Sequence, residues 1–401
     1  MKTFRYVKHE TFVKIALASM LFMTAVSASA ESEPFGKVVE YDIPGKMGST
    51  HEISSGPGNS LWVTQQKNSR LVKLSSEGKM EFYPLPAGSG PHGLKFDKLG
   101  RMWVTLEFLD EIVQVGLDGK IVSRFKIPLK GVGPHGLAVA ADGTIWWTGK
   151  VGNVIGRLDP ANGKMEIFPL KNQPSKPIYI SPGPNGNMWF TELEGSRVGK
   201  ISSAGEITTF SLPTENARPI VIFPGPDGLM WFTEERGNAY GTITEDGIIT
   251  EYPTGVEDGM LAGATFDGVG NLWLQFNRPD IVQRVAKDKS ILTFKLPSAG
   301  AVQHRITYGS DGKIWLTQLG TDKVAYIKIP EITGIWKNIK GDLVLKLNTS
   351  NTGIQLAYSK DLEAPFVQFP NVARQGTDEL IVDSTSPELQ NAHGFFRVAN
   401  E

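Results

Sequence analysis

Met188-Trp189-Phe190-Thr191-Glu192 is a short hydrophobic strand pattern centred on a tryptophan, and the strand-like segment Ser196-Arg197-Val198-Gly199-Lys200-Ile201 follows it after a polar turn. A second turn leads to a third such segment, Gly205-Glu206-Ile207-Thr208-Thr209-Phe210. The unit recurs along the chain, with tryptophans at positions 62, 103, 146, 189, 231, 273 and 315 and spacings of 41, 43, 43, 42, 42 and 42 residues. Self-similarity at a fixed period indicates a repeat protein with seven units.

Each unit contains four short apolar segments separated by turns. Pairs such as Asp142-Gly143 and Asp227-Gly228 supply the positive φ angles that tight hairpin turns require. Four short antiparallel strands per ~40 residues are typical of a β-propeller blade. A helical repeat would need apolar residues at i, i+3, i+4 and i+7, and no segment shows that spacing. The sequence therefore predicts an all-β protein with a seven-bladed β-propeller.

The repeat also defines the domain boundaries. Residues 36–44 resemble the fourth strand of a unit, whereas the last unit ends after its third strand, before Pro330. We expect the N-terminal strand to complete blade seven and close the ring, which leaves no open sheet edge. The propeller is assigned to residues 31–330. Residues 331–401 break the period and contain strand-like runs, so we expect a small C-terminal β-sandwich-like accessory domain there.

Residues 1–30 have the pattern of an export signal. Basic residues precede an apolar stretch from Ile15 to Ala25, and Ala28-Ser29-Ala30 fits a cleavage site before Glu31. The apolar stretch is shorter than the ~20 residues of a membrane-spanning helix, which makes a membrane anchor the less favoured alternative. We expect a cleaved signal peptide, no transmembrane segment, and a periplasmic or secreted protein.

The composition excludes several classes of function. The 401 residues include 41 Lys+Arg and 42 Asp+Glu, a formal net charge of -1, so there is no basic excess of the kind that nucleic-acid binding requires. The chain has no cysteine. Disulfides, thiolate nucleophiles, cysteine-ligated zinc and iron–sulfur clusters are therefore excluded.

Four of the six histidines share one register of the repeat. The register lies 11 residues before each tryptophan and is occupied by His51, His92, His135, Ile178, Ile220, Ala262 and His304. Because blade seven abuts blade one, the histidines fall in four consecutive blades and should form an arc around the channel. Imidazoles titrate near neutral pH and can act as bases, acids or metal ligands. Alternatively, they persist in register because they cap turns such as Gly-Pro-His-Gly at 90–93.

Carboxylates in a second register are expected near this arc. The second strand of a blade ends at the face where the first begins, because the two strands run antiparallel. Residues three and four positions after the tryptophans include Glu107, Glu192 and Glu234. Carboxylates beside imidazoles can bind a hard cation or raise imidazole basicity. The alternative is that they belong to a solvated polar rim.

These motifs resemble the virginiamycin B lyase (streptogramin lyase) family. The resemblance rests on Gly-Pro-His-Gly-Leu at 90–94, on the Asp-Gly or Leu-Gly turns, and on tryptophan strands that end in Thr-Glu or Leu-Glu. It covers residues 35–330 and not the C-terminal tail. It implies a seven-bladed propeller that opens cyclic depsipeptide antibiotics by magnesium-dependent elimination, and hence a link to antibiotic resistance.

The resemblance also implies roles for individual residues. His92 matches the catalytic base in its Pro-His-Gly turn, and His51 matches the catalytic histidine of the preceding blade. Glu107 matches one of two acids that hold Mg²⁺, whereas the position of the other, two residues before the base, is Gly90. The residues expected to bind substrate are His135, His304, Glu192 and Glu234.

Three functions remain open from the sequence. The first is an exported lyase that opens a cyclic depsipeptide or a related ester by elimination. The second is a non-catalytic propeller that binds a small ligand, a glycan or a protein. The third is a lactonase-like hydrolase, although that class usually surrounds a central cation with acids and amides. In each case we expect a monomer with a small-molecule or peptide-like ligand at one face of the propeller.

Overall fold

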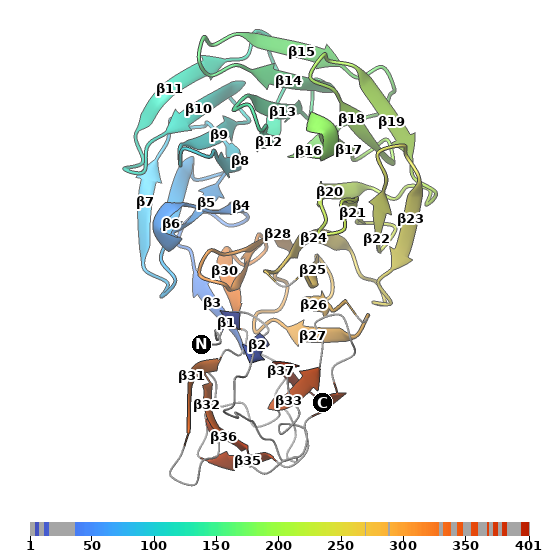
Figure 1. Cartoon of the computed structure of the whole chain (residues 1–401). Coiled ribbons are helices and arrows are strands. Elements are labelled where there is room, and N and C mark those ends of the chain that lie inside the picture. Colours follow the sequence, from blue (N-terminus) through green and yellow to red (C-terminus); the bar gives the residue numbers. More distant parts are fainter. Residues whose placement is uncertain are drawn as a thin grey trace.

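The computed structural model describes residues 37–328, apart from 269 and 288, and the backbones of several strands nearer the termini. Seven four-stranded antiparallel sheets surround a central axis (Figure 1). The prediction of an all-β seven-bladed propeller is confirmed. Between residues 37 and 328, helical structure is limited to two 3-10 turns, η1 (Pro57–Asn59) and η2 (Pro184–Gly186).

The two inner strands of each blade include the histidine and tryptophan registers. The innermost strands are β4 (Thr50–Ser55), β8 (Pro91–Phe96), β12 (Pro134–Val139), β16 (Pro177–Pro182), β20 (Pro219–Pro224), β24 (Leu261–Phe266) and β28 (Gln303–Tyr308). The second strands are β5 (Leu61–Gln65), β9 (Met102–Leu106), β13 (Ile145–Gly149), β17 (Met188–Glu192), β21 (Met230–Glu234), β25 (Leu272–Phe276) and β29 (Ile314–Gln318).

The two outer strands of each blade complete the sheet. The third strands are β6 (Arg70–Leu74), β10 (Glu111–Val115), β14 (Val154–Leu158), β18 (Arg197–Ile201), β22 (Ala239–Ile243), β26 (Ile281–Val285) and β30 (Lys323–Lys328). The outermost strands are β7 (Met80–Pro84), β11 (Ile121–Lys126), β15 (Met165–Pro169), β19 (Ile207–Ser211), β23 (Ile249–Pro253), β27 (Ile291–Lys295) and β3 (Lys37–Asp42).

The repeated tryptophan forms the packing between blades. Trp62 is fully buried and belongs to one hydrophobic cluster with Leu94 and Val104 of the next blade. Its ring also stacks on Tyr83 of its own blade, with 5.3 Å between centroids. A buried aromatic side chain removes ~150–250 Å² of surface from water. One such contact per blade boundary explains why this residue recurs.

The ring is closed by β3, the closure that the sequence predicts. β3 pairs antiparallel with β30, from Lys37 opposite Lys328 to Asp42 opposite Lys323. It thereby becomes the fourth strand of the sheet that contains β28. The third and fourth strands of blade seven thus come from opposite ends of the propeller sequence, and β3 completes its four-stranded sheet.

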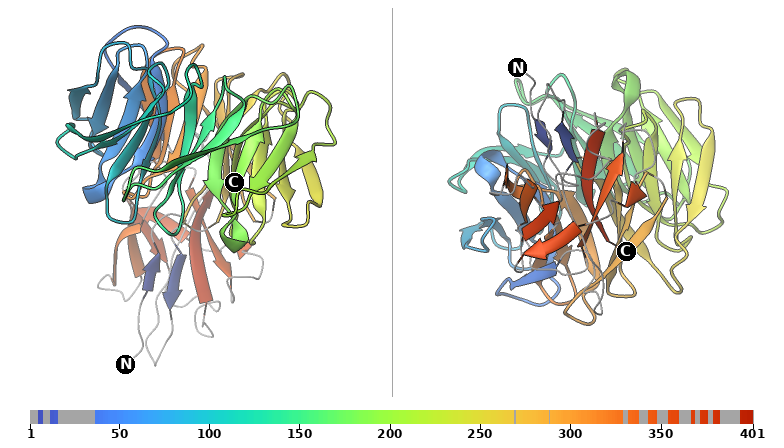
Figure 2. Two further views of the ribbon diagram at one scale, coloured as in Figure 1. Left: turned by 90° about the horizontal axis from the view of Figure 1, so that it is seen from above. Right: turned by 60° about the horizontal axis from the view of Figure 1, so that its bottom comes forward.

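Strands nearer the termini form two further antiparallel sheets, in the orders β1-β2-β37-β33-β34 and β31-β32-β36-β35. They are β1 (Arg5–Val7), β2 (Phe12–Ile15), β31 (Ile332–Lys337), β32 (Leu343–Leu347), β33 (Ile354–Ser359), β34 (Val367–Gln368), β35 (Val372–Gln375), β36 (Glu379–Val382) and β37 (Gly394–Asn400). Figure 2 shows them to one side of the ring of blades. The expected cleavage site after Ala30 lies outside the described residues, and the signal peptide stays a prediction. Cleavage there would remove β1 and β2 from the five-stranded sheet.

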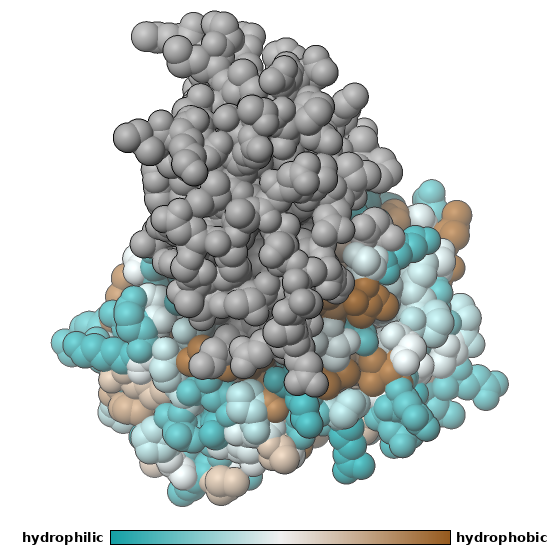
Figure 3. Space-filling view, turned by 90° about the horizontal axis from the view of Figure 1, so that it is seen from below, coloured by the Kyte–Doolittle hydropathy of each residue, from teal (hydrophilic) through white to brown (hydrophobic). Residues whose placement is uncertain are grey.

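The face of the described residues that Figure 3 shows is mainly hydrophilic. In Figure 3 the larger apolar areas border the grey residues, and the rest of that face is mostly teal or white. Within the described part of the chain, no helix has the length and apolar character needed to cross a membrane.

Candidate functional site

Each histidine follows the first residue of an innermost strand and lies in a β-bulge. The pairing register shifts between Thr50 and Ile53, Pro91 and Leu94, Pro134 and Leu137, and Gln303 and Ile306. A bulge leaves a residue out of the ladder and changes the direction of its side chain. The other three blades also have a register shift at the start of their innermost strands, so the residue in this register is presented in the same way in all seven blades and is an imidazole in four consecutive ones.

A threonine two residues after the tryptophan holds each of these bulges in place. The Thr64 hydroxyl accepts a hydrogen bond from the backbone N–H of Glu52 at 3.0 Å and donates one to the carbonyl of His92 in the next blade at 2.9 Å. Equivalent donations join Thr105 to His135 at 2.9 Å and Thr317 to His51 at 2.7 Å. These threonines are not among the residues predicted from the sequence, although the position is threonine in six of the seven units. Their recurrence at a fixed offset was the available signal.

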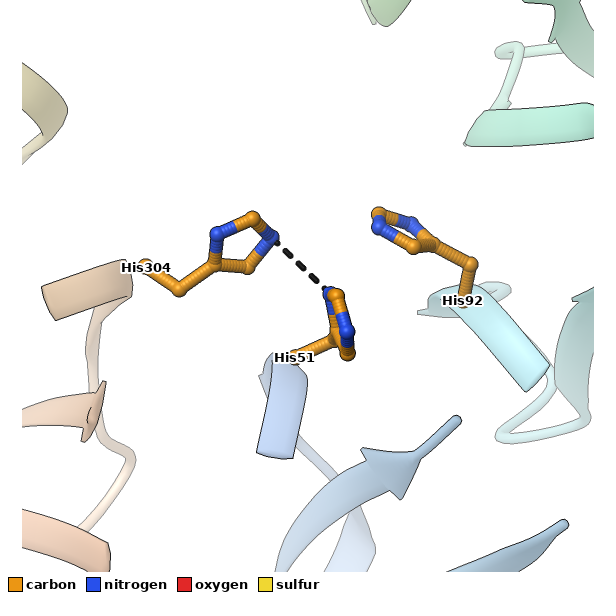
Figure 4. Close-up of side chains that lie close together, drawn as sticks. All are labelled: His51, His92 and His304. Carbon is orange, nitrogen blue, oxygen red and sulfur yellow. Dashed lines mark hydrogen bonds between the residues drawn. The ribbon is translucent and has the colours of Figure 1, made fainter. Parts of the chain in front are cut away.

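The four imidazoles form one cluster. The His51 Nδ1 atom lies 3.2 Å from the Nε2 atom of His304 (Figure 4). The ring centroids of His51 and His92 are 4.8 Å apart, and those of His92 and His135 are 3.6 Å apart. Identical register in the repeat therefore does bring these four side chains together.

Burial keeps these imidazoles in the neutral form. It is the main cause that lowers the pKa of His92 well below 6.5, followed by the adjacent His135. Burial and the charge of Lys150 do the same to the pKa of His135. Burial and the charge of Arg305 lower the pKa of His51 to about 3. Neutral imidazoles hold a lone pair, so they can accept a proton or bind a metal ion.

Two of the rings differ in their hydrogen bonding. The His135 Nδ1 atom lies 2.9 Å from the carbonyl oxygen of Ile178, and because a carbonyl can only accept, this nitrogen is the donor. The lone pair of His135 is therefore on Nε2. The Nδ1 atom of His92 is buried and has no hydrogen-bond partner among the described residues.

Glu107 is the predicted carboxylate that reaches the cluster. Its side chain is 9% exposed, and its oxygens accept hydrogen bonds from Gln66 at 2.7 Å and from Lys150 at 3.4 Å. One oxygen lies within 4.8 Å of ring nitrogens of both His92 and His135. Burial raises the pKa of Glu107, although Lys150 and Gln66 act in the opposite direction. The carboxylate is thus already occupied by an ammonium and an amide.

The position of the second expected acid is shaped for glycine. Gly90 has a φ of +59°, and a Cβ atom there would lie 2.4 Å from the ring of Phe108. A carboxylate side chain at this position would therefore need both a strained backbone and a displaced phenyl ring. In the two metal-capable groups that the described histidines form, Glu107 is the single oxygen ligand. Mg²⁺ prefers oxygen ligands, so these residues do not fit the Mg²⁺ ion that the resemblance implies.

The structure does not bring Glu192 and Glu234 together with the imidazoles. Both are fully buried at the ends of second strands, and neither is in the ligand groups of the described histidines. Glu192 binds the guanidinium of Arg197 at 2.7 Å. The residue paired with Glu234 in the ladder is Ala239, which offers no such partner. Burial and the nearby Glu251 raise the pKa of Glu234 to about 8.

Replacing Glu234 with glutamine is expected to make the variant more stable than the unchanged protein at alkaline pH. Because the folded pKa of about 8 lies above the reference value of 4.5, the native state keeps a proton that the unfolded chain has lost, and stability falls as the pH rises from 4.5 to about 8. At pH 9 the variant should gain about 1–3 kcal/mol in the free energy of unfolding, because glutamine carries no charge at a buried position where the deprotonated carboxylate of Glu234 has no hydrogen-bond partner among the described residues. Denaturant unfolding at pH 5 and pH 9 measures the difference. Glu192→Gln is the matched control and should destabilise the protein, because it leaves Arg197 without its carboxylate. An unchanged pH dependence in Glu234→Gln would contradict the prediction.

A charged layer adjoins the histidines along the same strands. Glu52 binds Lys95 at 3.1 Å and Arg305 at 3.2 Å. Both cations lie over the ring of Tyr179, at 5.8 Å and 5.5 Å from its centroid. This network of charges is not among the features predicted from the sequence either. Its signal was the residue type directly after His51 and His304, a glutamate and an arginine of opposite charge.

Seven blades with a cluster of imidazoles at the innermost strands define a β-propeller with a polar site at the mouth of its channel. The chain belongs to the virginiamycin B lyase family, whose model matches residues 18–170 and 100–334. No curated protein matches the chain by sequence.

Solved structures of lyases resemble the propeller. A streptogramin B lyase is 27% identical, with a TM-score of 0.70 over 74% of this chain and 98% of that chain. The selenomethionine-substituted virginiamycin B lyase from Staphylococcus aureus is 28% identical, with a TM-score of 0.68 over 73% of this chain and 99% of that chain. A catalytically inactive histidine-to-alanine variant of the same enzyme, with quinupristin, gives the same identity and TM-score.

Proposed function

We propose that this protein is an exported C–O lyase that opens a cyclic depsipeptide or a related ester by elimination, with His92 as the base. Membership of the virginiamycin B lyase family supports the reaction class. The observation that carries the proposal is the buried Nδ1 atom of His92, which has no hydrogen-bond partner among the described residues. The similar S. aureus enzyme is catalytically inactive as a histidine-to-alanine variant.

In this mechanism the neutral imidazole of His92 takes a proton from the carbon next to the substrate carbonyl. The C–H electron pair becomes a carbon–carbon double bond, and the ester C–O bond breaks so that its oxygen leaves as a carboxylate. A general base must be unprotonated at the working pH in order to take this proton. His51, with its ring centroid 4.8 Å from that of His92, is held by its contact with His304 and would orient or relay the proton.

Lys150 would supply positive charge where negative charge develops. Its ammonium lies 3.4 Å from Glu107, whose carboxylate is within 4.8 Å of His92 and His135, and its charge lowers the pKa values of His51, His135 and His304. A fixed positive charge in a site of low dielectric stabilises an enolate oxygen far better than it would in water. The proposed elimination therefore needs no step at a bound magnesium ion.

Apolar side chains near the cluster suit a peptide-like substrate. Phe108 and Val151 follow the second strands of blades two and three, and they are 59% and 64% exposed. Phe108 lies against Gly90, two residues before His92, and Val151 lies against Gly133, two residues before His135. Apolar residues around a few polar groups are typical of sites for small organic ligands.

A propeller that binds its ligand without turnover is the second candidate. The Lys150–Glu107 ion pair favours it, because this pair occupies the carboxylate of the cluster. The same face would then hold a ligand through imidazole hydrogen bonds and the apolar rim. No described feature favours the lactonase-like hydrolase, since a single carboxylate among imidazoles does not make a cage of acids and amides.

A panel of cyclic depsipeptides and simple cyclic esters, incubated with and without EDTA, tests the proposal. Elimination gives a linear product of unchanged mass with a new conjugated double bond, which ultraviolet absorbance and mass spectrometry detect together. We expect this product both with and without EDTA. A product that has gained one water would show hydrolysis. Binding of a panel member without any product would contradict the proposed lyase activity and favour a propeller that binds its ligand without turnover.

A further inference from the structure

Three of the imidazoles converge from separate blades. Figure 4 shows His51 of β4, His92 of β8 and His304 of β28 turned toward one another. One ring nitrogen of each lies within 4.8 Å of the others. We propose that His51, His92 and His304 form a binding site for a transition-metal ion such as Zn²⁺. This site goes beyond the proposed elimination, which involves no metal.

The spacing of the nitrogens matches such an ion. Two nitrogen ligands of a tetrahedral Zn²⁺, each at ~2.0–2.1 Å from the metal, stand roughly 3.3 Å apart. The Nδ1 atom of His51 and the Nε2 atom of His304 are 3.2 Å apart. One ring nitrogen of His92 lies within 4.8 Å of both other ligands, and its Nδ1 atom has no hydrogen bond to another described residue that metal binding would break.

The donor type selects the class of metal. Imidazole nitrogens suit Zn²⁺, Cu²⁺ and Ni²⁺, whereas Mg²⁺ and Ca²⁺ prefer oxygen. Three protein ligands leave a fourth position of a tetrahedral ion for water or for a ligand, the arrangement found in catalytic rather than structural zinc sites.

The backbone of all three residues is fixed. Their carbonyl oxygens each accept a hydrogen bond, from Thr317 to His51 at 2.7 Å, from Thr64 to His92 at 2.9 Å and from Arg305 to His304 at 2.9 Å. Ligands that are already held in position lose little conformational freedom when the ion binds. The neighbouring charge of Arg305 is balanced by Glu52, 3.2 Å away.

A second group of possible metal ligands consists of His92, Glu107 and His135, but its carboxylate already has hydrogen-bond partners. The Glu107 carboxylate is engaged by Lys150 and Gln66 at 3.4 Å and 2.7 Å. A divalent ion there would also face the Lys150 ammonium at close range. The three-histidine group is therefore the better metal site of the two.

Metal binding and the proposed elimination compete for His92. A metal-bound imidazole has given up the lone pair that would take the proton, so the metal-bound protein would be inactive as a lyase. Zn²⁺ is accordingly expected to inhibit turnover and EDTA to restore it.

Calorimetric titration tests the site directly and without substrate. The full chain, free of any histidine tag, is treated with EDTA, dialysed and titrated with ZnCl₂, NiCl₂ or MgCl₂. We expect one Zn²⁺ per chain and no heat of binding with Mg²⁺. His51→Gln and His304→Gln should each weaken Zn²⁺ binding by ~100-fold or more, since even outer partners of metal ligands are worth 10–100-fold. His135→Gln is the matched control and should leave the zinc affinity unchanged.

Melting curves of each variant without metal show whether it is folded, and only folded variants are compared. Unchanged zinc affinity in folded His51→Gln and His304→Gln would overturn the proposal, as would the absence of binding at millimolar Zn²⁺. Loss of binding in His135→Gln and Glu107→Gln, with His304→Gln unaffected, would place the ion in the other group. None of these results bears on the elimination, which is assayed in EDTA, so the two proposals fail separately.

Discussion

Replacing His92 with alanine is expected to lower the turnover of a cyclic depsipeptide by ~10²-fold or more, the usual scale for the loss of a positioned base. The His92 imidazole is buried among the other three rings, and no described residue stands in for its free nitrogen. Initial rates in the presence of EDTA measure the effect. His135→Ala should lower turnover less, because the His135 Nδ1 atom is committed to the carbonyl of Ile178.

The pH dependence of the rate follows from the same burial. The pKa of His92 lies well below 6.5, so the base is already unprotonated at neutral pH. The rate should therefore not fall as the pH drops from 7.5 to about 6.5, and should decline only at lower pH, as His92 takes up a proton. If His92→Ala and His135→Ala keep every activity and affinity but melt several degrees lower, the histidines are turn and core residues, and the functional interpretation of the cluster is wrong.

The fold was predictable because each blade repeats the same interior. A buried tryptophan, an aromatic stacking partner in the outermost strand and a glycine-containing turn recur together, so the structure of one blade predicts that of the others. The closure by residues 36–44 was predictable for the same reason, because the segment has the pattern of an outermost strand while blade seven lacks one.

The arc of imidazoles was predictable from register, but the carboxylates around it were not. Strand alternation places residues three and four positions after the tryptophan in different environments. Glu192, at three, is still in its strand and is buried beside Arg197. Glu107, at four, has left the strand and reaches the imidazoles. Sequence spacing alone does not distinguish these two positions, and the substrate-binding roles of Glu192 and Glu234 stay predictions.

The contacts that define the chemistry of the cluster depend on conformation. That Lys150 occupies the carboxylate of Glu107 follows from the separation of two neighbouring blades and from two side-chain rotamers, which no sequence spacing specifies. The left-handed backbone of Gly90 and its contact with Phe108 are of the same kind. Sequence could show that an acid is missing there, and only the structure shows why one would not fit.

Deleting residues 35–44 is expected to prevent the propeller from folding, whereas deleting the tail 331–401 should leave it folded. The deletion of residues 35–44 removes β3 and exposes the edge of β30, which is otherwise paired along its whole length. It also removes the buried Ile43 and the ring of Tyr41, which stacks on Trp315 with 6.4 Å between centroids. Loss of two such side chains costs ~2–5 kcal/mol each, against a total stability of about 5–15 kcal/mol for a typical protein. Circular dichroism and thermal melting of the purified variants measure the difference.

A chain in which residues 37–44 are moved to follow residue 328 tests whether the propeller needs the strand itself or its place at the N-terminus. Lys37 lies opposite Lys328, so a short turn can connect residue 328 directly to residue 37. The permuted chain therefore lacks residues 35–44 at its N-terminus and the tail 331–401, and carries residues 37–44 after this turn. Every other blade is connected from its third to its fourth strand in this way. The permuted chain should therefore fold and melt close to the tail deletion, since it restores the same ladder with a local connection. If the chain without residues 35–44 folds as well as the permuted chain, β3 does not close the ring. If the tail deletion alone unfolds the blades, residues 331–401 are part of the propeller's folding unit and not a separate domain.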